Sequence, residues 1–345
     1  MQRSTSSAPV AAQTGEGSPL AALDPVGREL INRFQHGLPL VAEPFGEMGR
    51  QLGVEEPAVL EALQGLAERG ILSRVGPVFR PHTLGASTLA ALAVPEGRLE
   101  AVGEWISGFR EVNHNYEREH PFNLWFVVGA PDREGVDGVL EAIRGETGLE
   151  PLDLPLLRDF HIDLGFSLDE GDLRGPRPGH GGEPVEAVEP GPRERRLVKA
   201  IQDGLALVSR PFARAGERAG LSEDEVLGYL RQWQATGVLK RMGLVVRHQE
   251  LGYLANGMVV WDIPDGELER VGEDLARDPC VTLCYHRPRR GPAWPFNLFT
   301  MIHGRDRDWV KARARDLAET SGMADRPREI LFSRRRFKQR GARYE

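Results

Sequence analysis

The sequence predicts an α+β protein built as a tandem repeat, in which each half holds a helix-turn-helix (winged-helix-like) domain followed by a ferredoxin-like βαββαβ domain. The first observation is internal duplication: residues 70–86 (GILSRVGPVFRPHTLGA) align without a gap with residues 237–253 (GVLKRMGLVVRHQELGY), and eight of seventeen positions are identical. The second is a repeated motif, HNYEREHPFNLW at 114–125 and CYHRP followed by PFNLF at 284–299. A period of roughly 170 residues indicates two domain-sized copies, because stacking repeats run about 20–50 residues.

The repeat and the composition together predict six segments. Both ends of the first half are rich in Gly, Pro, Ser and acidic residues without apolar periodicity, and such segments bury too little to fold alone. The predicted segments are a disordered tail at 1–23, a helix-turn-helix domain at 24–83, a ferredoxin-like domain at 84–166, a linker at 167–193, a second helix-turn-helix domain at 194–250 and a second ferredoxin-like domain at 251–345.

The first segment of each half is expected to be helical, because apolar residues such as Val59, Leu63 and Leu66 recur at helical spacing. Short helices joined by Gly-containing turns, followed by residues 75–79 as a β-wing, are typical of DNA-binding proteins. The expected recognition segment, 55–69, however carries four glutamates against one arginine. An acidic helix loses the counterion release that drives binding to a phosphate-lined groove. These modules are therefore predicted to dimerise or act as a scaffold rather than to bind DNA.

The second segment of each half alternates between strand and helix patterns. The expected order in the first copy is a strand at 89–95, a helix at 99–109, strands at 112–118 and 122–128, a helix at 136–144 and a final strand at 156–166. The second copy follows from 258 to 337. This combination resembles Lrp/AsnC-type regulators, whose ferredoxin-like domains pair face to face. We expect the two halves to form that pair within one chain.

Composition excludes several classes of protein. The 345 residues carry a net charge of −7 and contain no run of roughly 18 apolar residues, so a membrane protein is not expected. Cys280 and Cys284 are too few for a disulfide framework and wrongly spaced for a CxxC redox or zinc site. We therefore expect a cytoplasmic protein without a metal site of its own.

The candidate site lies on the strand that opens the repeated motif. Side chains alternate between the two faces of a strand, so His114, Tyr116 and Arg118 are expected to point together. In the second copy Tyr285 and Arg287 share that face, whereas His286 falls on the opposite face unless the strand bulges. Leu283 replaces His114 there. A histidine, a phenol and a guanidinium on one face suit a flat ligand with several negative charges.

The second copy also inserts a basic and aromatic loop, Arg289 to Trp294. Arginine forks bind carboxylates in pairs, and Trp294 offers a face to a planar ring. The alternative is that Arg289 and Arg290 form a solvated turn while Trp294 packs against the sheet. The basic run 334–338 (RRRFK) is either a solvated edge or a second wall of the same site.

The motifs CYHRPRRGPAWPFNLFTMIHG and HNYEREHPFNLWF resemble the signature of the siroheme decarboxylases, including the fused two-half form of haem d1 biosynthesis. The resemblance implies removal of carbon dioxide from the C12 and C18 acetate groups of siroheme, giving 12,18-didecarboxysiroheme. No added cofactor is implied, because the iron is part of the substrate. The family's essential histidines imply catalytic roles for His286 and His303.

The resemblance also guides the remaining expectations. Tyr285 is the expected proton relay, and the substrate-binding residues are expected to be Arg287, Arg289, Arg290, Trp294, His114, Tyr116, Arg118 and His120. Expected partners are siroheme and, as options, further siroheme decarboxylase subunits or a second copy of this pseudo-dimeric chain, but not DNA or a membrane. Whether both halves are catalytic, and whether a histidine donates a proton or binds the iron, stays open. The alternatives are a ligand-sensing Lrp/AsnC-type regulator and a non-catalytic tetrapyrrole-binding subunit.

Overall fold

The computed structural model describes residues 23–81, 83–162, 165, 168 and 190–341. Most of the predicted tail and of the predicted linker lies outside these residues, but Leu23, the last residue of the predicted tail, is buried in the helix-turn-helix core. Leu168, at the start of that linker, is buried in the helix-turn-helix core, and the helix that opens the second half already begins at Pro192. In the described part of the chain, no helix is long and apolar enough to cross a membrane.

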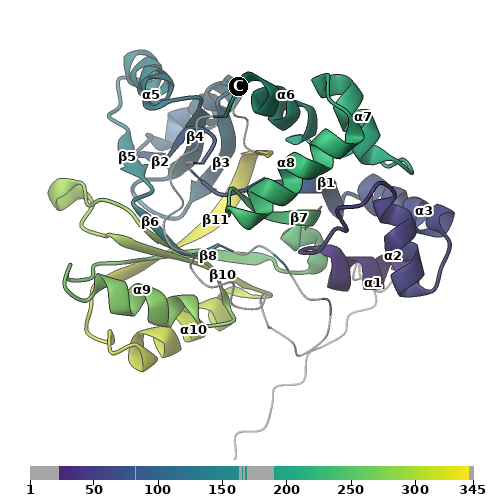
Figure 1. The fold of residues 1–345 in the computed structure, drawn as a ribbon. Coiled ribbons are helices and arrows are strands. Elements are labelled where there is room, and N and C mark those ends of the chain that lie inside the picture. Colours follow the sequence, from purple (N-terminus) through teal and green to yellow (C-terminus); the bar gives the residue numbers. More distant parts are fainter. Residues whose placement is uncertain (1–22, 82, 163–164, 166–167, 169–189, 342–345) are drawn as a thin grey trace, which may run out of the picture.

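The two helix-turn-helix modules lie side by side at one end of the molecule (Figure 1). Their elements are α1 (Pro25–Phe34), α2 (Pro44–Leu52), α3 (Glu56–Glu68) and β1 (Leu72–Phe79) in the first half, and α6 (Pro192–Ile201), α7 (Pro211–Ala219), α8 (Glu223–Ala235) and β7 (Leu239–Val246) in the second. Helix α8 begins with a capping box between Ser222 and Glu225. Helices α2 and α7 end at left-handed glycines, Gly53 and Gly220.

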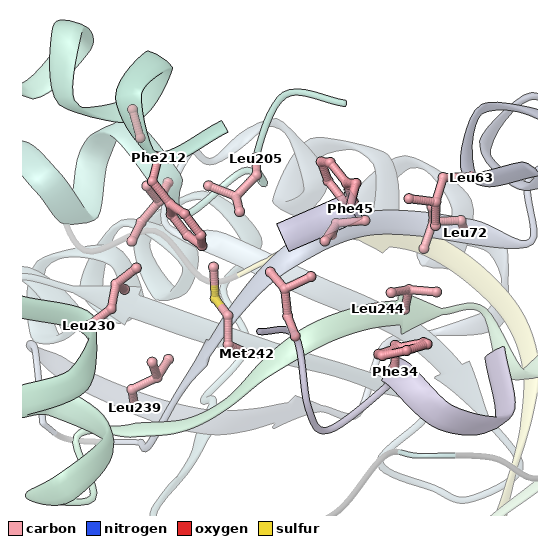
Figure 2. Close-up of a cluster of buried hydrophobic side chains, with 14 of the residues drawn as sticks. Phe34, Phe45, Leu63, Leu72, Leu205, Phe212, Leu230, Leu239, Met242 and Leu244 are labelled. Atoms are coloured by element: carbon pink, nitrogen blue, oxygen red, sulfur yellow. The ribbon is translucent and has the colours of Figure 1, made fainter. Parts of the chain in front are cut away.

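The expected β-wings differ from a winged helix, because β1 pairs with β7 of the other half. The pairing is antiparallel and places Gly76 opposite Gly243. The backbone at the end of α1 passes so close to β7 that a Cβ on Gly243 would lie 2.2 Å from the carbonyl oxygen of Gln35. One hydrophobic core then fills both modules, with Phe34, Phe45 and Leu63 packed beside Phe212 and Met242 (Figure 2).

The remaining strands form one nine-stranded sheet in the order β5-β2-β4-β3-β11-β8-β10-β9-β6. The first half supplies β2 (Ala86–Leu92), α4 (Leu99–Gly108), β3 (Val112–Arg118), β4 (Leu124–Ala130), α5 (Arg133–Thr147), β5 (Leu152–Pro155) and β6 (Arg158–Ile162). The second supplies β8 (Ala255–Trp261), α9 (Leu268–Ala276), β9 (Val281–His286), β10 (Leu298–Gly304), α10 (Arg307–Thr320) and β11 (Arg328–Gln339). The orders β5-β2-β4-β3 and β11-β8-β10-β9 are both ferredoxin-like, as predicted.

The last strand of each half crosses into the other half. Strand β11 pairs with β8 over residues 328–332 and then with β3 over residues 333–339. In the first half the single strand expected at 156–166 is wrong: β5 pairs with β2, the chain breaks after Pro155, and β6 pairs with β9. Pro155 has no amide proton to continue the ladder, which favours the break at this point.

Each half covers the outer face of its part of the sheet with helices (Figure 1). Helices α4 and α5 pack on the first half's strands, and α9 and α10 pack on the second's. The inner faces meet in a mixed core that includes Trp125, Leu154, Val260, Trp294 and Phe299. The two ferredoxin-like domains therefore pair face to face within one chain.

Two expected strand boundaries shift because of an asparagine. The strand expected at 89–95 ends at Leu92, and the strand expected at 122–128 begins at Leu124. Asn123, just before the second of these strands, accepts a hydrogen bond from the amide of Val94, just after the first (2.9 Å), and donates one to the Val94 carbonyl (2.8 Å). Asn297 makes the same two contacts with Ile263. The Pro-Phe-Asn-Leu part of the repeated motif is thus a structural clamp.

Candidate functional site

The three residues His114, Tyr116 and Arg118 of β3, here called the first cluster, lie together as the strand alternation predicts. The rings of His114 and Tyr116 stack with centroids 6.3 Å apart, and the Arg118 guanidinium lies 5.9 Å from the Tyr116 ring centre. Asn115, on the opposite face, bonds instead to the Gly103 carbonyl of α4. The first cluster therefore faces the inside of the pseudo-dimer.

The surroundings of the first cluster lower the pKa of both of its basic side chains. Burial, and secondarily the charge of Arg74, lowers the pKa of His114 to about 4. Burial also lowers the pKa of Arg118 to about 10. Arg118 donates to the Leu331 carbonyl of the other half (2.8 Å), while its Nε has no hydrogen-bond partner among the described residues. A buried cation without a carboxylate is expensive, and such groups mark candidate binding sites for anions.

Tyr285 and Arg287 form the second cluster, at the equivalent place on β9. The Arg287 guanidinium lies 5.2 Å from the Tyr285 ring centre and donates to the Leu154 carbonyl of the first half (2.5 Å). Burial lowers the pKa of Arg287 to about 10 and raises the pKa of Tyr285. The two clusters are thus related by the pseudo-symmetry of the chain, down to the carbonyl that each arginine contacts.

His286 does not join the second cluster. The ladder between β9 and β10 runs without a bulge from Leu283 to His286, so the imidazole points to the opposite face from Tyr285. Burial lowers the pKa of His286; the charge of Asp265 opposes this shift and the charge of Arg289 adds to it. The catalytic trio expected from the sequence is therefore not assembled around this residue.

His303 is also remote from Tyr285. It lies on the inner face of β10, is only 5% exposed, and its Nδ1 is 2.9 Å from Thr282 Oγ1. Tyr285 is paired with Phe299, four residues before His303 in the strand. At about 3.3 Å per residue, roughly 13 Å of strand separates them.

His120 links the two halves. Its Nδ1 accepts from the Phe122 amide (2.9 Å), and its Nε2 lies 3.0 Å from Glu329 of β11. The ring also meets the edge of Trp294, with centroids 5.4 Å apart. Burial lowers the pKa of His120 more than Glu329 raises it. The geometry gives His120 a role between the halves rather than on the face of the first cluster.

The inserted loop turns inward and is held by the protein's own acids. Arg289 pairs with Asp262 (2.8 Å) and Asp265 (2.7 Å), and Arg290 donates to the Asp153 carbonyl (2.6 Å). Trp294 is fully buried in the mixed core where the inner sheet faces of the two halves meet. The structure thus favours packing for Trp294, and it shows Arg289 and Arg290 as ion-paired loop anchors instead of a solvated turn or open carboxylate clamps.

Charged residues from other elements surround the clusters; Arg336 belongs to the basic run 334–338 that the sequence offered as a second wall of the site, whereas sequence reasoning missed the others. Arg74 of β1 acts on His114, and Arg336 of β11 is paired with Tyr116. Asp159 of β6 is paired with Tyr285 and forms an ion pair with Arg80 (3.3 Å). Among the described residues, no group of three or more His, Cys, Asp or Glu side chains is gathered for a metal ion.

Fold and site together define a class: tandem helix-turn-helix modules joined to paired AsnC-like ligand-binding domains. The family "Siroheme decarboxylase NirDL-like HTH domain" matches residues 27–72 and 194–239, and "AsnC-like ligand binding domain" matches residues 83–161 and 250–338. The siroheme decarboxylase NirDL subunit of Paracoccus pantotrophus is 43% identical over 93% of this chain and 97% of its own. The chain belongs to the siroheme decarboxylase family.

Two further comparisons bear on the halves and on the ligand. The siroheme decarboxylase NirD subunit of Stutzerimonas stutzeri is 56% identical over 43% of this chain and 97% of its own. A crystal structure of the siroheme decarboxylase NirDL in co-complex with an iron-uroporphyrin III analogue superposes with a TM-score of 0.67, at 29% identity, over 93% of this chain and 94% of that one.

Proposed function

We propose that this protein is a siroheme decarboxylase of haem d1 biosynthesis, which removes the C12 and C18 acetate carboxylates of siroheme to give 12,18-didecarboxysiroheme. The observation that carries the proposal is the likeness to NirDL across both halves at 43% identity. At each of the two positions the bond between the methylene carbon and the carboxylate breaks. Carbon dioxide leaves, and one proton converts the methylene carbon into a methyl group.

Binding is assigned to Arg118, the buried arginine of the first cluster. Arg118 lies with a phenol and without a paired carboxylate among the described residues, so a substrate carboxylate can supply its missing counter-charge. An arginine on the reacting carboxylate would stabilise the ground state and slow the loss of carbon dioxide. We therefore assign Arg118 to a non-reacting carboxylate, whose binding energy presses the reacting acetate into a drier environment.

The proton donor is proposed to be His114 in place of His286 and His303, because only His114 shares the face of a Tyr–Arg pair at close range. In the empty protein His114 is neutral at pH 7. Nearby negative charges raise the pKa of a histidine, so an octacarboxylate substrate would charge the imidazole as it binds. Proton delivery is then coupled to occupancy of the site. The iron arrives with the substrate, and we propose no added cofactor.

A transcription regulator is not favoured. Glu56, at the start of the acidic helix α3, accepts a hydrogen bond from Ser209 of the other module (2.9 Å). Arg231 of α8 donates to the Leu40 carbonyl (2.7 Å). Each expected recognition helix is thus engaged by the other module, and we do not propose DNA as a partner. Because relatives carry subunit names, assembly with further chains of the family is part of the proposal.

Anaerobic incubation of the purified chain with siroheme tests the function directly. Mass spectrometry should show a product lighter by two carbon dioxide units. Arg118→Met should weaken siroheme binding roughly ten- to a hundredfold, since a charge-assisted hydrogen bond contributes about 1.5–3 kcal/mol. Arg214→Met, on an exposed arginine of α7, is the matched control and should bind normally. Siroheme that binds without losing mass would instead identify a non-catalytic tetrapyrrole-binding subunit.

A further inference from the structure

Asp159 and Arg336 occupy equivalent positions in the two crossing strands. Five residues before each of them is a leucine whose carbonyl accepts from a cluster arginine, Leu154 for Arg287 and Leu331 for Arg118. Directly after each of them is a phenylalanine that interrupts the ladder and packs against a helix glycine, Phe160 on Gly272 and Phe337 on Gly103. The pseudo-symmetry of the fold is therefore strict at this point of the chain.

The charge at this position is reversed between the halves. Arg336 is paired with Tyr116, and Asp159 is paired with Tyr285. Residues directly opposite each other in an antiparallel pair share a face of the sheet. One cluster tyrosine therefore has a cation beside it and the other has a carboxylate.

The wider surroundings repeat this difference. Burial raises the pKa of both phenols, and the arginine of each cluster, Arg118 or Arg287, opposes that rise. The clusters differ in the next contribution: the charge of Arg336 also lowers the pKa of Tyr116, whereas the charge of Asp159 raises the pKa of Tyr285. Asp159 also holds Arg80, in an ion pair whose side chains are only 10% and 15% exposed. Around the first cluster the charged neighbours that act on His114 and Tyr116 from other strands, Arg74 and Arg336, are both cations.

We propose that the first cluster alone takes the carboxylates of the tetrapyrrole, and that the charge at the position of Arg336 and Asp159 selects it. At the first cluster an incoming carboxylate meets Arg118, Arg336 and Arg74. At the second it meets Arg287 but also Asp159, whose carboxylate repels it and forms an ion pair with Arg80. The assignment rests on the proposed function, and it names Arg336 as a substrate-binding residue that favours one half.

Titration of the wild-type chain with siroheme under anaerobic conditions, followed by absorbance, should give one bound siroheme per chain. Arg336→Gln should weaken this binding roughly tenfold and Arg336→Asp roughly a hundredfold or more, as expected for a lost and then reversed charge contact. Arg334→Gln is the matched control, since Arg334 is also exposed on β11 but pairs with Glu119. Asp159→Asn should change the affinity less than twofold.

Two equal siroheme sites per chain would overturn the assignment. So would normal binding by Arg336→Asp, or lost binding by Asp159→Asn. The readout is binding, so the result is separate from turnover: a chain that binds one siroheme through Arg336 but releases no carbon dioxide keeps this inference and refutes the proposed reaction.

Discussion

At the scale of single residues, the first cluster keeps ionisable groups where their charged forms are disfavoured. His114 and Arg118 both have lowered pKa values because they are buried, and the Arg118 guanidinium contacts a carbonyl and an aromatic ring but forms no ion pair with a carboxylate of the described residues. Such an arrangement costs stability in the empty protein. The same arrangement is expected at a site that an anionic ligand completes. Its cost can be measured as a dependence of the free energy of unfolding on pH.

The pH dependence of stability should report on His114. An unfolded chain binds a proton at this histidine below about pH 6.5, whereas the folded chain does so only below about 4. The unfolded state is therefore favoured as the pH falls from 6.5 to 4, and the stability that depends on neutral His114 is complete above 6.5 and lost across that window. The loss is about 3 kcal/mol, at 1.36 kcal/mol for each unit of pKa.

His114→Gln removes this titration. Urea unfolding at pH 7, 5.5 and 4 should show the wild type losing about 3 kcal/mol relative to the variant, most of it below pH 5.5. Parallel stability curves for the two proteins would show that His114 is not buried in its neutral form.

The residue-level predictions succeeded where local geometry sufficed. Strand alternation placed His114, Tyr116 and Arg118 on one face, and it placed His286 on the other. The loop arginines could not be assigned in the same way. Their partners, Asp262, Asp265 and Asp153, are distant in sequence, and Asp153 belongs to the other half. Charge content alone does not tell a ligand clamp from an internal ion pair.

At the scale of elements, the crossing strands β6 and β11 decide the architecture. Each carries a phenylalanine that lies against a glycine of the partner helix, α9 or α4, so the glycine makes room for the crossing. The sequence pattern predicted the ferredoxin-like order but not the crossing. A strand that pairs with two different neighbours along its length has the same alternation as a strand with one, so its second partner is not visible in the pattern.

Substitution of these glycines should loosen the crossing. A Cβ on Gly103 would lie 2.5 Å from the Phe337 ring, and one on Gly272 would lie 2.4 Å from the Phe160 ring. Gly103→Ala and Gly272→Ala should each destabilise the protein by roughly 1–3 kcal/mol, because overpacking exceeds the gain in helix propensity.

Gly138→Ala supplies the control for this pair of variants. Gly138 is in the middle of α5 and has open space where a Cβ would go. That variant should be stabilised by up to about 1 kcal/mol, as for Gly to Ala in a helix. Chemical denaturation of the three proteins checks the sign of each effect. Stabilisation by all three would mean that the phenylalanines do not require the glycines.

At the scale of the whole molecule, the two halves are interlocked at every level. They share the helix-turn-helix core, the β1–β7 pair, the crossing strands and the mixed core between their inner sheet faces. Ion pairs such as Glu119 with Arg307 add to the contact between them. The duplication predicted this pseudo-dimer, because a module that pairs with itself in the Lrp/AsnC architecture can pair with its own copy when the two are fused.

A cut in the segment between the halves should therefore leave the molecule assembled. Residues 169–189 connect Leu168, in the shared core, to α6. Fragments 1–178 and 179–345, co-expressed with a tag on one of them, should co-purify as a one-to-one complex. Without its partner, each fragment exposes an unpaired strand edge and an apolar sheet face, and it should aggregate or pair with itself.

Thermal unfolding distinguishes the split protein from the intact chain. Dissociation accompanies unfolding of the two fragments, so their midpoint should rise with protein concentration, whereas the midpoint of the intact chain should not. The half-length NirD relative, which covers 43% of this chain, shows that a family member can consist of one such half. If the fragments were stable monomers that migrate separately on a sizing column, the crossing strands would not hold the halves together. In that case the apolar surface buried between the halves would contribute far less free energy of association than its area indicates.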